Sequence, residues 1–254
     1  MDRAAIDEVA AMFVRARSRG DRLDALPARL KPKNFAESRA VMDAVDRLVG
    51  DRIVGTKIAA KPGAEVVYAP LHASRVFASP ARVPLKLVPS RYMECEISFR
   101  LTRDLPARSA PYSEPEVFDC LEACPAFELV DSRFRDLKSA MATAPYDFYA
   151  DHIANGAMVF GAFRNDWQNF DFGKTRVAMK QGARTIVDKV GGHPTGNPAI
   201  PAVVLANLRR STTGLAAGTM VVTGSFTGYH PVELNAPVMG EVEGFGTMEA
   251  TIVG

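Results

Sequence analysis

The stretch Glu94–Leu101, with the sequence ECEISFRL, contains Cys95–Leu101, one of the short runs that favour β-strands and decide the expected fold. Side chains alternate along a strand, so Glu94 and Glu96 are predicted to point to one face and Cys95 to the other. The other predicted strands are Ile53–Ile58, Phe127–Val130, Met158–Gly161, Val177–Lys180, Thr185–Val190, Met220–Thr223 and Met248–Val253. Gly, Pro and Asn separate these runs, which predicts a curled, largely antiparallel sheet or barrel with a hairpin around Gly182.

The first fifty residues are predicted to be helical. One helix ends at Gly20, and its apolar residues recur at helical spacing: Ile6, Val9, Phe13 and Val14. Asn34 and Glu37 have the spacing of a helix cap, and the helix that follows them is predicted to end at Gly50. The apolar face of this second helix is predicted to consist of Val41, Val45 and Leu48.

Two further helices are predicted to interrupt the β-rich part. A capping box opens the first, which is predicted to contain Ser113, Glu116, Val117, Leu121 and Cys124 and to end at Pro125. The second is predicted to run from Pro198 to Arg210. The fold class is therefore α+β, with a helical N-terminal portion (residues 1–50) and a β-rich catalytic domain (residues 51–254) that form one continuous structural unit.

Composition excludes several classes of protein. The 254 residues carry 31 Lys and Arg against 29 Asp and Glu, and the basic residues are dispersed, so nucleic acid is not an expected partner. No stretch approaches the roughly 18 apolar residues of a membrane span. The cysteines Cys95, Cys120 and Cys124 lack the pairing of a zinc site, and their odd number without a secretory signal predicts reduced thiols in a cytoplasmic protein.

Three glutamates form the first chemically suggestive group. Glu94 and Glu96 share a strand face, and Glu128 lies in an apolar run where an unpaired charge is costly. Carboxylates held together repel each other and favour a divalent cation between them, and oxygen ligands suit Mg²⁺ or Mn²⁺. Two other interpretations stay open: Glu94 and Glu96 mark the solvated face of a strand, and Arg133 is the partner of Glu128.

Lys57 lies in the predicted strand Ile53–Ile58, among apolar residues. A lysine in this setting either protects an exposed edge strand from pairing or directs its ammonium group into a site. The sequence does not decide between these two interpretations.

Eight short segments, taken in their order along the chain, carry a family resemblance: Gly55–Ile58, Ala73–Pro80, Glu94–Glu96, Phe99–Leu105, Pro125–Arg133, Ala150–Asp151, Asn155–Gly156 and Thr223–Thr227. Together they resemble the 2-keto-4-pentenoate hydratase and 4-oxalocrotonate decarboxylase branch of the fumarylacetoacetate hydrolase (FAH) superfamily. The resemblance implies an FAH C-terminal-like fold, a curled mixed sheet or barrel, that assembles into a homo-oligomer.

The same resemblance implies roles for individual residues. Glu94, Glu96 and Glu128 would bind Mg²⁺ or Mn²⁺, and the glutamate at 128 favours the hydratase and decarboxylase branch. The catalytic residues would include Lys57, Asp131 and Asp151, with Asp131 orienting Lys57 or a water molecule. The substrate would contact Arg133, Ser225 and Thr227.

One segment departs from the family pattern, which is usually Ala-Asp-Asn-Ala-Ser. Here it is Ala150–Ala154, with His152 in place of the asparagine and Ala154 in place of the serine. His152 is either an additional acid–base catalyst, since histidine titrates near neutral pH, or a structural histidine with its own partner.

The leading functional hypothesis is hydration of a 2-hydroxy-2,4-dienoate, a small 2-oxo acid substrate of aromatic catabolism. The alternative is decarboxylation of a 4-oxalocrotonate-type 2-oxo-3-enedioate, whose second carboxylate needs a further cation, with Lys61, Arg75 and Arg133 as candidates. A third hypothesis is a non-catalytic ligand-binding relative or partner subunit. A related decarboxylase or aldolase is a further possible partner.

Overall fold

Strand β5, Tyr92–Leu101, is an interior strand from which the rest of the architecture follows. In the computed structural model, which describes residues 1–254, β5 pairs antiparallel with β6, Leu121–Val130. The register is unbroken over ten pairs, from Tyr92 opposite Val130 to Leu101 opposite Leu121. An unbroken register fixes which side chains face each other, so Glu94 lies opposite Glu128.

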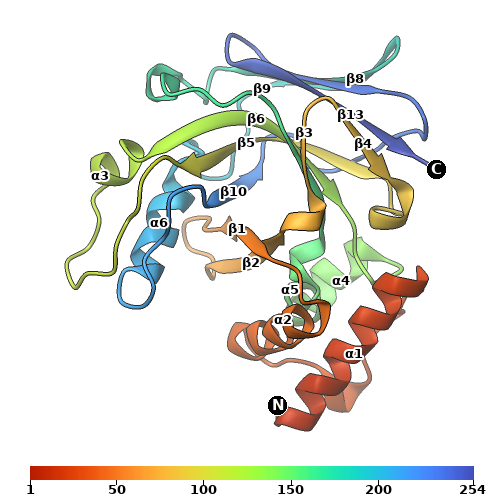
Figure 1. The fold of residues 1–254 in the computed structure, drawn as a ribbon. Helices are drawn as coiled ribbons and strands as arrows, with labels where there is room; N and C mark the ends of the chain where they lie inside the picture. Colours follow the sequence, from red (N-terminus) through yellow and green to blue (C-terminus); the bar gives the residue numbers. More distant parts are fainter.

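The two strands belong to an eight-stranded sheet whose main path runs β2-β1-β10-β5-β6-β7-β3 (Figure 1). Its other members are β1 (Ile53–Ala59), β2 (Val67–His72), β3 (Val76–Ala78), β7 (Asn155–Phe160), β10 (Met220–Ser225) and β11 (His230–Pro231), which pairs with β5. The β1–β10 and β3–β7 pairs are parallel, and the other pairs are antiparallel. The predicted curled, largely antiparallel sheet is therefore confirmed.

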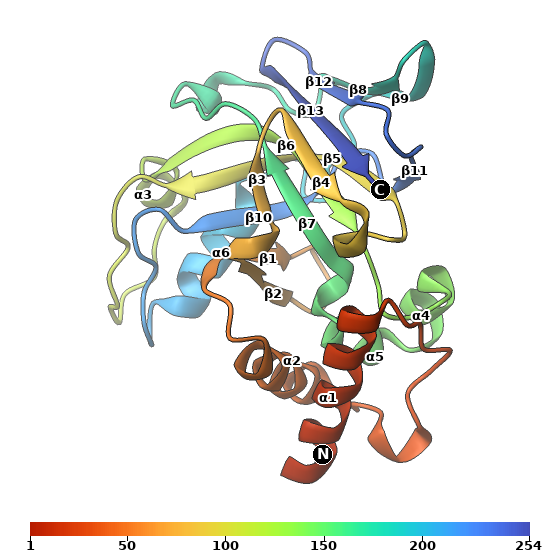
Figure 2. The same ribbon diagram turned by 45° about the vertical axis from the view of Figure 1, so that its right-hand side comes forward.

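A second sheet of five strands covers one face of the first (Figure 2). Its order is β4-β13-β12-β8-β9, formed by β4 (Ala81–Pro84), β8 (Arg176–Gln181), β9 (Arg184–Val190), β12 (Val238–Val242) and β13 (Gly246–Val253). The predicted hairpin is the β8–β9 pair, and Gly182 at its tip has φ of 59°, a left-handed conformation that favours glycine.

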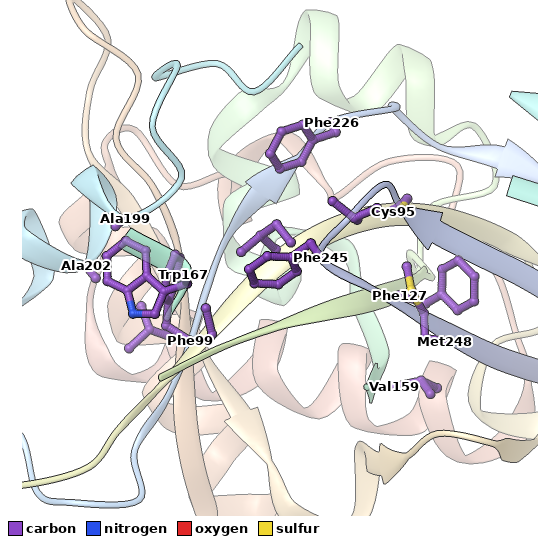
Figure 3. Close-up of a cluster of buried hydrophobic side chains, with 14 of the residues drawn as sticks. Cys95, Phe99, Phe127, Val159, Trp167, Ala199, Ala202, Phe226, Phe245 and Met248 are labelled. Atoms are coloured by element: carbon purple, nitrogen blue, oxygen red, sulfur yellow. The ribbon is translucent and has the colours of Figure 1, made fainter. Parts of the chain in front are cut away.

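The main hydrophobic core includes side chains between the two sheets (Figure 3). Phe127 of β6 lies beside Met248 of β13, and both are almost fully buried. Gly240 of β12 lies so close to the Phe127 ring that an added Cβ would be 2.6 Å from its Cζ, so the sheets approach here because residue 240 has no side chain. Trp167 closes one end of the core by packing its ring 5.2 Å from that of Phe99 and donating a hydrogen bond to the Leu121 carbonyl.

The N-terminal helices lie against the opposite side of the large sheet from the second sheet (Figure 1). Helix α1 spans Arg3–Arg19 and α2 spans Phe35–Val49, and they end at Gly20 and Gly50 as predicted. The Asn34 side chain accepts a hydrogen bond from the Glu37 amide, so the predicted cap is confirmed. These helices share a second core with α4 (Leu137–Thr143) and α5 (Pro145–Ala150), which includes Val9, Phe13, Leu30, Val41 and Val45.

Leu48 does not belong to the buried face of α2. It is 57% exposed, whereas Val41 and Val45 are fully buried. The prediction for Leu48 is wrong because the face of α2 that packs against α1 and α5 does not extend to its last turn. The second N-terminal helix, α2, ends at Val49, and β1 begins at Ile53. The division of the chain into a helical portion and a β-rich domain at residue 50 stays a prediction.

The helix predicted after Ser113 is much shorter than expected. The capping box of Ser113 and Glu116 is present, but α3 covers only Glu114–Phe118. Leu121 and Cys124 lie in strand β6, because pairing with the whole of β5 outweighs the local helical spacing.

Pro125 lies within strand β6 rather than ending a helix. Its carbonyl accepts a hydrogen bond from the amide of Gly161, just past the end of β7. Its missing N–H is therefore tolerated where the neighbouring strand ends.

The second predicted helix is confirmed as α6, Ile200–Arg209. The sequence did not indicate β2, β3, β4, β11, β12, α4 or α5. Most of these are too short for a periodic pattern. Strand β2 contains Pro70, a residue that favours a loop, but β2 is an edge strand, where a missing backbone donor is tolerated.

No helix combines the length and hydropathy that a membrane span requires.

Two leucines of α6 give a matched test of this packing. Leu205 is fully buried, and Leu208 is 44% exposed on the same helix. We expect Leu205→Ala to lower the free energy of unfolding by about 2–5 kcal/mol and Leu208→Ala to change it by about 0.5 kcal/mol or less. Chemical denaturation of both variants measures the difference, and equal losses would contradict the placement of α6.

Candidate active site

Three glutamates converge on the adjacent strands β5 and β6. Glu94 and Glu96 alternate along β5 to one face, and Glu128 of β6 lies opposite Glu94. One carboxylate oxygen from each can be chosen such that all three lie within 4.8 Å of one another. Glu96 and Glu128 are completely buried, so the alternative of a solvated strand face is wrong for Glu96.

These carboxylates lack enough donors to satisfy them. Both oxygens of Glu96 and the Oε2 atom of Glu128 are buried without a hydrogen-bond partner. Burial, together with the charge of Glu128, raises the pKa of Glu94 to about 7. Burial and the charges of Glu128 and Glu94 also raise the pKa of Glu96. Unpartnered, mutually repelling oxygens in a dry setting fit a divalent cation, which would satisfy all three groups.

Lys57 provides the positive charge of the site. Its Nζ atom lies 2.6 Å from Glu128 Oε1 and donates a second hydrogen bond to the Ile153 carbonyl at 3.1 Å. Burial lowers the pKa of Lys57, but attraction to Glu128, Glu94 and Glu96 outweighs this effect and raises it, which keeps the ammonium protonated. Strand β1 lies between β2 and β10, so the edge-strand interpretation of Lys57 is wrong.

Asn155 is a member of this site that sequence reasoning did not assign. Its side-chain amide lies 3.1 Å from the same Glu128 oxygen that contacts Lys57. Asn155 lies within one of the segments that carry the family resemblance, so its position there was the available signal. Lys57 and Asn155 both hold one oxygen of Glu128 and leave the other without a partner.

Arg133 and Asp151 form a buried ion pair instead of facing the glutamates. The Arg133 Nε donates to Asp151, and the backbone amide of Arg133 lies 2.7 Å from Asp151 Oδ2. Ser132 donates to the same carboxylate. The alternative that Arg133 neutralises Glu128 is therefore wrong, because Lys57 is the residue that forms the ion pair with Glu128. No contact supports the predicted substrate-binding role of Arg133 or the catalytic role of Asp151, and both stay predictions.

Asp131 has partners other than the one predicted. Its Oδ1 atom accepts hydrogen bonds from Arg22 at 2.8 Å and from the Ser90 hydroxyl at 2.6 Å. It makes no hydrogen bond to Lys57. The structure links Asp131 to Lys57 only indirectly, because the Asp131 amide donates to the carbonyl of Ala154, the residue after Ile153.

The segment His152–Ala154 (η4) has an unusual backbone. All three residues have positive φ, at 54°, 53° and 54°, which strains side chains with a Cβ by roughly 1–2 kcal/mol per residue. The strained turn presents the Ile153 carbonyl to Lys57. His152 Nε2 lies 2.8 Å from Asp46 Oδ1 of α2, so this histidine has a structural partner. Burial lowers the pKa of His152 to about 3, which keeps its imidazole neutral.

Ser225 and Thr227 lie where β10 ends beside β5. Ser225 is paired with Glu96 across the sheet, and Thr227 accepts a hydrogen bond from the Cys95 amide, between the two glutamates of β5. The Ser225 hydroxyl also accepts hydrogen bonds from the amides of Thr227 and Gly228. Both residues therefore lie next to the glutamates, as expected for a loop beside the site.

The buried ion pair gives a testable consequence. We expect Arg133→Met to lower the free energy of unfolding by about 3–5 kcal/mol, because it leaves the buried Asp151 charge without its partner. The matched control is Arg135→Met, which breaks an exposed pair with Asp24 and should change the value by about 1 kcal/mol or less. Urea denaturation of both variants checks this, and a small effect of Arg133→Met would argue against the pair.

Comparisons of the sequence with known proteins show which proteins this chain is similar to. No family model matches the chain. The 2-keto-4-pentenoate hydratase of Burkholderia vietnamiensis is 26% identical over 211 residues, covering 80% of this chain and 79% of that protein. A 4-oxalocrotonate decarboxylase of a Pseudomonas species is 26% identical over 164 residues, covering 64% of this chain and 60% of that protein.

Solved structures have the same fold. The 4-oxalocrotonate decarboxylase from Pseudomonas putida G7, complexed with magnesium and adipate, matches with a TM-score of 0.82 at 19% identity, covering 99% of this chain and 98% of that one. Fumarylpyruvate hydrolase from Pseudomonas aeruginosa, in complex with Mn²⁺ and pyruvate, matches with a TM-score of 0.58 at 13% identity, covering 80% and 90%. The chain is thus a homologue of the 2-keto-4-pentenoate hydratases and 4-oxalocrotonate decarboxylases and has the fold of the FAH superfamily.

Proposed function

We propose that this chain is a divalent-metal-dependent hydro-lyase that adds water to a 2-hydroxy-2,4-dienoate and forms a 4-hydroxy-2-oxo acid. The observation that carries the proposal is the convergence of Glu94, Glu96 and Glu128 beside the ammonium group of Lys57. The sequence similarity to 2-keto-4-pentenoate hydratase over 80% of the chain supports the substrate class.

The donor set fits Mg²⁺ or Mn²⁺. All three ligands offer carboxylate oxygens, which hard cations prefer. The thiol of Cys95, between Glu94 and Glu96 in the sequence, lies on the opposite face of β5 in the hydrophobic core. A bound ion supplies a positive charge that polarises the 2-oxo group of the substrate. Similar structures complexed with magnesium, or with Mn²⁺ and pyruvate, support the choice of ion and of a 2-oxo acid.

The residues of this chain have distinct parts in the proposal. Lys57 holds a proton at Nζ within reach of the glutamates, so it serves as the proton donor or binds the substrate carboxylate. Ser225 and Thr227 lie beside Glu94 and Glu96 and are proposed to contact the substrate. Asp131 and the turn at His152 are proposed to act through the Ile153 carbonyl, by positioning Lys57.

Decarboxylation of a 4-oxalocrotonate-type substrate is the alternative. Its second carboxylate needs a cation in addition to Lys57. Arg133 is paired with Asp151, and Arg75 donates to the carbonyls of Leu87 and Gly156, so both are committed within the protein. Lys61 is exposed, and its side chain has no hydrogen-bond partner, which leaves one of the three candidate cations available. This commitment of the arginines favours the hydratase.

A non-catalytic ligand-binding relative or partner subunit is the remaining alternative. The departures of His152 and Ala154 from the family pattern support it. They alter a turn whose contact with Lys57 is made through the backbone of Ile153, so the ammonium stays beside the glutamates despite the changed side chains. This arrangement favours an enzyme.

The proposal includes a homo-oligomeric assembly in the cytoplasm, with a related decarboxylase or aldolase as a further partner. The three buried, unpaired thiols of Cys95, Cys120 and Cys124 support a reducing compartment. Exposed apolar side chains such as Leu48 and Val190 are available for contacts between subunits.

The metal requirement can be tested by following the ultraviolet absorbance of 2-hydroxypenta-2,4-dienoate with Mg²⁺ present. We expect decay that chelator abolishes and that Glu96→Gln slows by roughly 100-fold or more, because the ion supplies several kcal/mol of charge stabilisation. Glu241→Gln, an exposed glutamate of β12, is the control and should keep the wild-type rate. Product analysis then separates 4-hydroxy-2-oxopentanoate from other products, and activity in chelator would sink the proposal.

Lys57→Met tests the assigned proton donor in the same assay. We expect a fall of about 10²–10⁴-fold in the turnover rate, the range typical of general acid–base groups. Lys180→Met, an exposed lysine of β8, is the matched control. A Lys57→Met protein that binds Mg²⁺ and turns over at the wild-type rate would show that the lysine assignment is wrong.

A further inference from the structure

A second group of metal-ligand side chains lies outside the three-glutamate site. Asp46 comes from α2, His72 from the end of β2, and His152 from the left-handed turn after α5. Their potential ligand atoms lie within 4.8 Å of one another. Residues from three distant parts of the chain therefore meet at the junction between the N-terminal helices and the large sheet.

Both imidazoles point at the same atom. His72 Nε2 lies 2.9 Å from Asp46 Oδ1, and His152 Nε2 lies 2.8 Å from that oxygen. The two ring centroids are 5.4 Å apart. Ligands of one ion converge in this way, with one nitrogen of each ring and a carboxylate oxygen around a common point.

The remaining oxygen of the carboxylate is not explained by hydrogen bonding. Asp46 Oδ2 is buried and has no hydrogen-bond partner, and the Asp46 side chain as a whole is 11% exposed. A carboxylate that served only to receive two imidazole protons would be expected to use both oxygens, since each unsatisfied buried acceptor costs about 1–3 kcal/mol. A cation would satisfy this second oxygen.

We propose that Asp46, His72 and His152 form a second metal site, suited to a transition ion such as Zn²⁺ rather than to Mg²⁺. Imidazole ligands favour Zn²⁺ and similar ions, whereas the all-carboxylate set of Glu94, Glu96 and Glu128 favours hard cations. The two sites therefore select different ions by their donor atoms. Three protein ligands leave one position of a tetrahedral ion for Asp46 Oδ2 or a water molecule.

The distances require little rearrangement. With bonds of about 2.0–2.1 Å, neighbouring ligand atoms of a tetrahedral ion lie roughly 3.3 Å apart. The two nitrogen–oxygen separations, 2.8 and 2.9 Å, need to widen by a few tenths of an ångström for an ion to enter.

The site joins two parts of the molecule. Asp46 belongs to a helix of the N-terminal portion, and His152 directly precedes Ile153, whose carbonyl holds Lys57. An ion bound here would stabilise the strained turn and tie α2 to the sheet. The site does not depend on the proposed hydratase activity, because its ligands are separate from the three glutamates and its test reads metal binding.

Binding of Co²⁺ to full-length protein tests the site, because Co²⁺ replaces Zn²⁺ and gives visible absorption bands. The protein is stripped with chelator, saturated with Mg²⁺ to fill the glutamate site, and titrated with Co²⁺. We expect one equivalent with tetrahedral-type bands, retained in Glu96→Gln and in the control His230→Gln. His72→Gln and His152→Gln should each weaken Co²⁺ binding by at least about 100-fold. This loss is larger than the one expected if the histidine were only a hydrogen-bond partner of a metal ligand.

X-ray absorption of the Zn²⁺-bound wild-type protein gives a readout that does not depend on how the variants fold. Two imidazole nitrogens and carboxylate oxygen around the ion are expected. The proposal is overturned if Mg²⁺-saturated protein takes up neither Co²⁺ nor Zn²⁺, if the ion has only oxygen ligands, or if folded His72→Gln and His152→Gln bind Co²⁺ as the wild type does. The cluster is then a hydrogen-bonded contact between α2 and the sheet.

Discussion

The confinement of three carboxylates on two paired strands is the constraint on which this structure depends. If all ionise, Glu94, Glu96 and Glu128 contribute three negative charges, and Lys57 contributes one positive charge. Such a group of charges is unstable in a dry interior unless two requirements are met. The strands must be held in place, and the excess negative charge must be balanced. The unbroken pairing of β5 with β6 and the packed second sheet supply the first requirement. A divalent cation is proposed to supply the second.

The N-terminal helices also serve the site, although they are far from it in sequence. Residues 152–154 adopt a left-handed conformation that an isolated peptide of these residues would avoid. Contacts from several directions maintain it: Asp46 of α2 binds His152, the Asp131 amide binds the Ala154 carbonyl, and Lys57 binds the Ile153 carbonyl. Strain that persists next to a charged site is typical of a backbone that positions a functional group. The helical portion is therefore part of the site's support.

Local sequence signals were reliable where the local physics decided the outcome. The caps at Asn34, Gly20 and Gly50 were predicted because a helix end satisfies its own backbone groups with nearby residues. The segment Leu121–Pro125 shows the opposite case. It has helical spacing and a helix-ending proline, yet it forms a strand because β5 offers pairing along its whole length. Leu48 illustrates a third case, since helical periodicity cannot show how far along a helix its neighbours extend.

The sequence by itself determined the α+β class, the alternation that places Glu94 and Glu96 on one face, and the family resemblance that groups them with Glu128 and Lys57. Only the tertiary structure decided the partner of each charge. It pairs Lys57, and not Arg133, with Glu128, and it pairs Arg133 with Asp151. It also brings Asp46, His72 and His152 together from segments without a shared motif. The physical reason is that alternation and capping act between residues a few positions apart, whereas the pairing of buried charges depends on which strands and helices meet in space.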